Sequence, residues 1–127
     1  MKVKPIIIIN GEPNSIFLEI FLKSLKFKNY KSPIILISSL ELLRFNMKKL
    51  NYKKKIKLIN FKNQEITKLD NKSINLIDVK INLDKNFNKI TKKSNFFIKK
   101  TFDLGLHALK IFKSKKLING PISKKSF

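Results

Sequence analysis

The sequence lacks cysteine and has a single histidine among its 127 residues. Without cysteine the protein can form no disulfide, no thiolate zinc site and no cysteine nucleophile. One histidine, His107, cannot supply a metal site built from several histidines, and Asp103 precedes it by four residues, which favours a surface ion pair. No serine lies in the context of a nucleophile elbow. The chain by itself therefore holds no complete catalytic constellation.

Arginine is almost absent although the chain is strongly basic. Of 29 basic residues only Arg44 is an arginine, and the formal net charge is +21. Such a field attracts nucleic acid, anionic membranes or phosphorylated substrates. Proteins that recognise nucleic acid usually depend on arginine, whereas Lys, Asn, Ile and Phe together indicate A/T-rich codons. Compositional bias is thus the favoured explanation, and a small Lys-rich nucleic-acid-binding module, with "KKKIK" at 53–57, is the alternative.

Long apolar runs are also missing. The opening "MKVKPIIIIN" has four consecutive isoleucines, too few for the apolar region of a signal peptide. No run approaches the roughly 18 residues needed to span a bilayer. We therefore expect a soluble, cytoplasmic protein with no membrane partner. At 43% hydrophobic residues the chain can bury a core, and its length fits one domain over residues 1–127.

Short β-branched apolar runs alternate with amphipathic segments along the chain. The runs predict strands within 3–10, 32–39, 54–61, 78–84 and 116–119, and the amphipathic segments predict helices over 16–26, 40–50 and 94–113. Residues 62–73 and 84–95 are polar and predicted to be loops. This alternation predicts an α/β fold with a mainly parallel sheet flanked by helices. Gly105 interrupts the apolar stripe of the last helix, which a close approach of helix to sheet would explain, as would chance.

The stretches "IIIINGEP" and "LINGP" repeat one pattern, a strand ending in Ile-Asn-Gly followed by a proline turn. In a parallel sheet both turns emerge at the carboxyl edge, where open α/β proteins bind ligands. Their glycines would let backbone amides approach a ligand, although such dipeptides are also ordinary turn formers. Glu12 could accept a hydrogen bond from a hydroxyl group, and Lys124 near a helix start could hold an anion or simply be solvated. The candidate cleft residues are Gly11, Glu12, Pro13, Gly120, Pro121 and Lys124.

Both turns resemble those of the 4-hydroxythreonine-4-phosphate dehydrogenase family of vitamin B6 biosynthesis. The family's first turn, Gly-(Asp/Glu)-Pro-Ala-Gly-Ile-Gly-Pro-Glu, is matched at Gly11, Glu12, Pro13, Ile16 and Glu19. Its second turn, Thr-(Gly/Ala)-Pro-(Ile/Val)-x-Lys, is matched at Gly120, Pro121, Ile122 and Lys124. The sequence departs from the pattern at Asn14, Ser15, Phe17, Leu18 and Asn119. Phe17 is bulkier than the family residue and would restrict ligand approach to the first loop.

The resemblance implies an incomplete first domain of a two-domain, homodimeric enzyme with the fold of isocitrate and isopropylmalate dehydrogenases. Family members are more than twice as long as this chain, so the chain is expected to be an N-terminal portion truncated at its C-terminal end. The implied reaction is NAD-dependent oxidation and metal-assisted decarboxylation of 4-hydroxythreonine 4-phosphate, a small phosphorylated substrate. The family's metal-binding histidines would fall beyond Phe127, so no metal ligand and no catalytic residue is expected in this chain, which alone should be inactive.

A third possibility is an α/β interaction domain without catalysis. The position of the two proline turns discriminates it from the dehydrogenase: the dehydrogenase requires a first and a last strand that are parallel, with both turns at one edge of the sheet.

Overall fold

The computed structural model describes residues 4–61, 69–81 and 92–122, and its side chains from residue 95 onward in the last range. Five strands form one parallel sheet in the order β3-β4-β2-β1-β5. The strands are β1 (Ile6–Ile9), β2 (Ile34–Ser38), β3 (Ile56–Leu58), β4 (Ile74–Asp78) and β5 (Leu117–Asn119). The helices are α1 (Phe17–Phe27), α2 (Leu40–Lys49) and α3 (Lys92–Ile111). The predicted fold class, an α/β fold with a parallel sheet, is confirmed.

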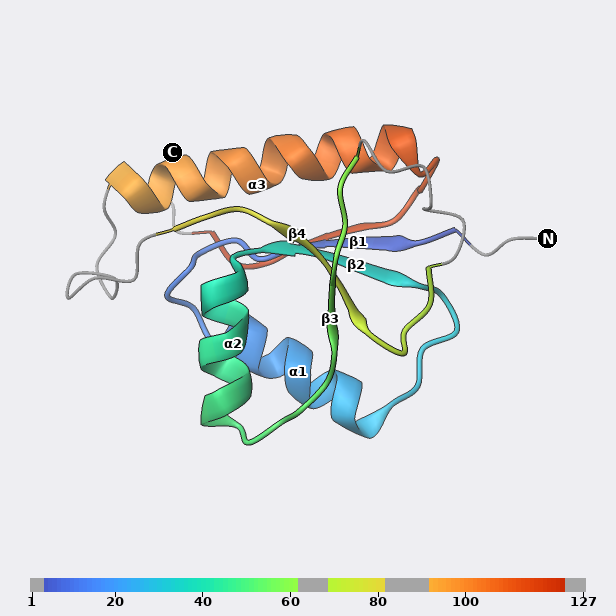
Figure 1. Ribbon diagram of the computed structural model, residues 1–127. Helices are drawn as coiled ribbons and strands as arrows, with labels where there is room; N and C mark the ends of the chain where they lie inside the picture. Colours follow the sequence, from blue (N-terminus) through green and yellow to red (C-terminus); the bar gives the residue numbers. More distant parts are fainter. Residues whose placement is uncertain (1–3, 62–68, 82–91, 123–127) are drawn as a thin grey trace.

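The sheet lies between two helical layers, with α1 and α2 on one face and α3 on the other (Figure 1). Strands β1, β2 and β4 consist mainly of apolar residues, as expected where both faces of a strand are covered. Ile7, Ile35, Leu36 and Leu76 are wholly buried there. None of the helices in the described ranges is long and apolar enough to cross a membrane.

The fourth strand lies earlier in the chain than the sequence predicted. A strand was expected over 78–84 from its strict alternation, but β4 ends at Asp78, and residues 82–84 lie outside the described ranges. The prediction missed this strand because Asn75 interrupts its apolar run. Its amide nitrogen donates to the carbonyl oxygens of Ile34 (2.9 Å) and Asp70 (2.8 Å), so this buried amide group is satisfied.

Gly105 allows α3 to approach the sheet closely. A Cβ atom at this position would overlap the Cδ1 atom of Ile9 and lie 3.3 Å from the Cδ1 atom of Leu117. The close approach that the sequence suggested is confirmed. On the same helix Phe97 and Ala108 are buried, whereas Phe102 and Ile111 are 37% and 38% exposed.

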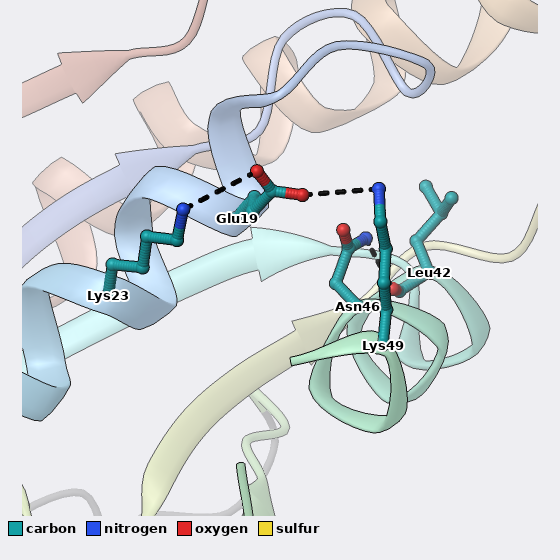
Figure 2. Close-up of polar contacts among 5 residues, drawn as sticks. All are labelled: Glu19, Lys23, Leu42, Asn46 and Lys49. Carbon is teal, nitrogen blue, oxygen red and sulfur yellow. Dashed lines mark hydrogen bonds and ion pairs between the residues drawn. The ribbon is translucent and has the colours of Figure 1, made fainter. Parts of the chain in front are cut away.

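Helices α1 and α2 are joined by an ion pair (Figure 2). Glu19 on α1 lies 3.2 Å from the Lys49 ammonium on α2 and 3.7 Å from that of Lys23, four residues further along α1. The hydrogen bond and charge of Lys49 are the main reasons that the pKa of Glu19 is lowered from its usual value. Asn46 donates to the Leu42 carbonyl oxygen one turn earlier, on the same side of α2 (2.9 Å).

Candidate functional site

The loops that follow β1 and β5 meet at the carboxyl edge of the sheet. The two strands are parallel neighbours, with Ile9 opposite Asn119. The Glu12 amide donates to the Pro121 carbonyl oxygen (2.9 Å), and the Gly120 amide donates to the Ile9 carbonyl oxygen (2.8 Å). The two proline-bearing turns therefore lie at one edge of the sheet, as the sequence predicted, and they are also in direct contact.

The glycines of these loops are required by this contact. Gly11 has a φ of 77°, and a Cβ atom there would lie 2.6 Å from the Gly120 carbonyl carbon and from the Pro121 carbonyl oxygen. A Cβ atom at Gly120 would overlap the Asn10 carbonyl oxygen. The space beside each glycine is filled by the backbone of the other loop, and the Glu12 and Gly120 amides are used within the pair. The glycines thus permit the two loops to pack, a role different from the two that the sequence suggested, which were approach of backbone amides to a ligand and ordinary turn formation.

The first loop is buried and braced from within. Asn10 and Glu12 are 1% and 7% exposed, and Pro13 is also buried. The Glu12 carbonyl oxygen accepts from the Asn10 side-chain amide (3.2 Å) and from the Ser15 hydroxyl (2.8 Å). Ser15 in turn accepts from the Phe17 amide (3.3 Å), which connects the turn to the first residue of α1. The loop is therefore held in one conformation by its own polar groups.

Neighbouring strands end at the same edge with further polar residues. Ser38 and Asp78 are paired in register at the ends of β2 and β4. One Asp78 carboxylate oxygen accepts from the Leu40 amide (2.8 Å), and the Ser39 hydroxyl accepts from the Leu42 amide (3.3 Å), so both cap the start of α2. Sequence reasoning did not include Asn10, Ser38 or Asp78. The available signal was a polar residue directly after each buried apolar run.

The outcome differs among the predicted loop residues, Lys124 and His107. Gly11, Glu12, Pro13, Gly120 and Pro121 lie together as described above, and their role in a cleft stays a prediction. Lys124 lies outside the described residues. His107 forms no ion pair with Asp103: its ring packs edge-on against Phe61, with centroids 4.8 Å apart. The ion-pair prediction was wrong: the neighbour of His107 is Phe61, in the segment after β3, which sequence spacing cannot reveal.

The described residues do not fit the metal or the dinucleotide that the resemblance implies. No group of three or more histidine, cysteine, aspartate or glutamate side chains comes together in the described ranges. Glu12 and Asp78 are the carboxylates at the carboxyl edge, and Asp78 is engaged with the start of α2. The positions beside Gly11 and Gly120 are filled by protein backbone, so these glycines form no open cradle for a pyrophosphate group. No chemical step through either group can be derived from these residues.

Solved structures share this arrangement over almost the whole chain. A 4-hydroxythreonine-4-phosphate dehydrogenase from Burkholderia phymatum superimposes with a TM-score of 0.79 and 16% identity, covering 99% of this chain and 38% of that chain. The enzyme of the same name from Klebsiella pneumoniae gives a TM-score of 0.76 and 15% identity, covering 97% of this chain and 38% of that chain. The chain has the fold of part of 4-hydroxythreonine-4-phosphate dehydrogenase.

The similarity is one of structure. No protein-family model matches the chain, and no curated protein matches it in sequence. The chain spans less than two fifths of the length of these dehydrogenases. The comparison therefore establishes the fold.

Proposed function

We propose that this chain supplies the first α/β domain of a cytoplasmic, homodimeric, NAD-dependent dehydrogenase that oxidises and decarboxylates 4-hydroxythreonine 4-phosphate in pyridoxal phosphate biosynthesis. One observation carries the proposal: the loops after β1 and β5 are bonded to each other at the carboxyl edge, through the Glu12 amide and the Pro121 carbonyl oxygen. Ligands of open α/β sheets bind outside this edge. The fold shared with two solved 4-hydroxythreonine-4-phosphate dehydrogenases supports the choice of reaction.

In this proposal the joined loops form one wall of the substrate cleft. Two prolines and the Glu12–Pro121 hydrogen bond keep the wall rigid, which reduces the entropy lost when substrate is positioned against it. The Glu12 carboxylate accepts a hydrogen bond from a substrate hydroxyl group. The hydride acceptor and the metal require residues other than those described, so the 127-residue chain alone should not turn over substrate.

Nuclear magnetic resonance can test the location of the cleft. ¹⁵N-labelled chain is titrated with 4-hydroxythreonine 4-phosphate, up to millimolar concentration. We expect shifts confined to the backbone amides of residues 10–12, 119, 120 and 122, and loss of these shifts in a Glu12→Gln variant that keeps the loop's shape. Shifts confined to any other part of the molecule, or none at all, would contradict the proposal.

An activity assay independently tests whether the catalytic groups lie outside this chain. The purified chain is incubated with substrate, NAD and Mg²⁺ or Zn²⁺, and NADH absorbance is followed. We expect no turnover above a buffer control. Measurable NADH formation would place the active site inside this chain and overturn the assignment of the catalytic groups to other residues.

A further inference from the structure

The loops that lead into the strands carry a concentration of lysine. These loops form the amino edge of the sheet, defined as residues 4–5, 28–33, 50–55, 69–73 and 112–116. Each loop contains at least one lysine, and the full set is Lys4, Lys28, Lys31, Lys53, Lys54, Lys55, Lys72, Lys113, Lys115 and Lys116. Asp70 is the one acidic residue in them. This end of the molecule therefore has a strongly positive field.

A cavity of about 360 Å³ opens at this edge, beside the end of α1. Three lysines from three separate loops line it: Lys28, Lys54 and Lys72. Leu25, Asn29, Tyr30 and Asn71 complete the lining. Small-molecule sites in proteins usually have volumes of roughly 300–1,000 Å³, so this amino-edge cavity lies within the range of a ligand site.

Asn71 fixes the shape of the amino-edge cavity. Its side-chain nitrogen donates to the carbonyl oxygens of Tyr30 (3.0 Å) and Ser32 (2.7 Å), and its side-chain oxygen accepts from the Ile34 amide (2.9 Å). These three bonds join the loop before β2 to the loop before β4. The Tyr30 hydroxyl is hydrogen-bonded to Ser24 on α1, which holds the aromatic wall of the cavity. Lys28 and Lys72 are thus carried by two loops that are joined to each other through Asn71.

The lysines around the cavity have no paired carboxylate among the described residues, where both ion pairs involve Glu19. Lys28 lies over the ring of Tyr30, 5.3 Å from its centroid, and Lys54 is half-buried. The Asp70 carboxylate is beside the cavity and accepts from the backbone amide of Lys72 (2.9 Å). One carboxylate cannot neutralise three lysines, so the amino-edge cavity keeps a net positive charge that attracts a polyanion.

We propose that the amino-edge cavity binds the oligophosphate group of a small molecule. Three lysines that line one concave surface match the charge of a short phosphate chain. A nucleic-acid strand is less well suited, because the lone arginine, Arg44, is on α2 and the Lys28 ammonium already lies over the Tyr30 ring on which a base would stack. The cavity lies at the opposite edge of the sheet from the proposed substrate cleft, so this inference does not depend on the dehydrogenase proposal.

Tripolyphosphate and ATP, both without divalent metal, distinguish a bare phosphate chain from one carrying a nucleoside. Binding is measured by calorimetry in 150 mM salt with wild-type protein and two charge-matched variants. The test variant carries Lys28→Gln, Lys54→Gln and Lys72→Gln. The control carries Lys80→Gln, Lys99→Gln and Lys100→Gln, which remove the same charge from exposed positions after β4 and on α3. Thermal unfolding establishes that both variants fold.

We expect the test variant to lose about tenfold or more in tripolyphosphate affinity and the control less than about twofold, because charges beyond a Debye length of about 8 Å are largely screened. Similar ATP affinity would indicate that the phosphate chain alone is bound. Equal losses in both variants would show only a general lysine field and overturn the proposal. Absence of binding by both probes, or binding of a DNA or RNA oligonucleotide alone, would overturn it too.

Discussion

The two edges of the sheet differ sharply in how they use charge and backbone. In the described residues after the strands, the charged side chains are Glu12, Asp78 and Lys80, and the loops are closed by backbone hydrogen bonds. The amino edge instead has ten lysines and Asp70 around loops that are joined by the Asn71 side chain. A lysine-rich composition sets how many lysines there are, whereas the fold decides where they gather. One edge is therefore closely packed through its backbone, and the other carries a concentration of positive charge.

Gly120→Ala should disrupt the packing of the two loops at the carboxyl edge and have the largest effect on stability. The new Cβ atom would overlap the Asn10 carbonyl oxygen, which is backbone and cannot rotate away. We expect a loss of about 3 kcal/mol or more in the free energy of unfolding, measured with urea. Asn119→Ala, at the exposed neighbouring position, serves as control and should change stability by less than about 0.5 kcal/mol. A Gly120→Ala protein as stable as wild type would contradict the packed contact between the two loops.

Asn71→Ala should break the amino edge with the next largest effect. It removes three hydrogen bonds that join two loops, each contributing about 1 kcal/mol, so we expect a loss of about 2–3 kcal/mol in urea unfolding. Tripolyphosphate affinity should fall in the same variant although no lysine is changed. The matched control is Asn29→Ala, an exposed residue at the same cavity. Equal stability of both variants would show that Asn71 does not support the edge.

Gly105→Ala should have a smaller effect than Gly120→Ala because its new neighbour is a side chain. The Cβ atom would overlap the Cδ1 atom of Ile9, which can move, and alanine gains about 1 kcal/mol in helix propensity. We expect a net loss of about 1 kcal/mol. Ile9→Val removes Cδ1, the nearer of the two Ile9 atoms that the new Cβ atom would meet, so the double variant should lose less than the sum of the two single changes. Strict additivity would argue against this contact.

Lys49→Gln should have the smallest effect on stability, and Lys49 belongs to neither set of edge loops. Lys49 lowers the pKa of Glu19, so its stabilising contribution is present above the ordinary carboxyl pKa and is lost as the pH falls through the lowered value. We expect a slightly lower Tm than wild type at neutral pH and no difference in strong acid. Lys48→Gln, which changes a neighbouring exposed lysine, should show no such pH dependence. A difference of equal size at both pH values would exclude the Glu19 ion pair as its cause.

Much of the fold was readable because its signals are local. The isoleucine runs predicted β1 and β2, and apolar periodicity predicted all three helices to within a few residues. The position of β4 was missed because Asn75 is satisfied by the Ile34 carbonyl oxygen, 41 residues away in sequence. Insertion of β4 between β3 and β2 was equally unreadable, since strand order depends on tertiary packing.

The candidate site was predictable in location and less so in detail. Two similar turns at the ends of parallel strands had to emerge at one edge. That Gly11 and Gly120 accommodate each other's backbone could not be inferred, because it depends on the distance between two loops that are far apart in sequence. The amino-edge cavity was missed for the same reason: its three lysines come from separate loops, and each is unremarkable alone.

The pairing of β1 with β5 has a consequence for the order of folding. One side of β1 can find its partner, β2, soon after synthesis, but the other side must wait for residues 117–119. Until then the growing chain presents an unpaired isoleucine strand, the kind of edge that attracts other chains. A nascent or proteolysed form that stops before Leu117 should aggregate, so pairing with β5 helps to keep the folded protein soluble.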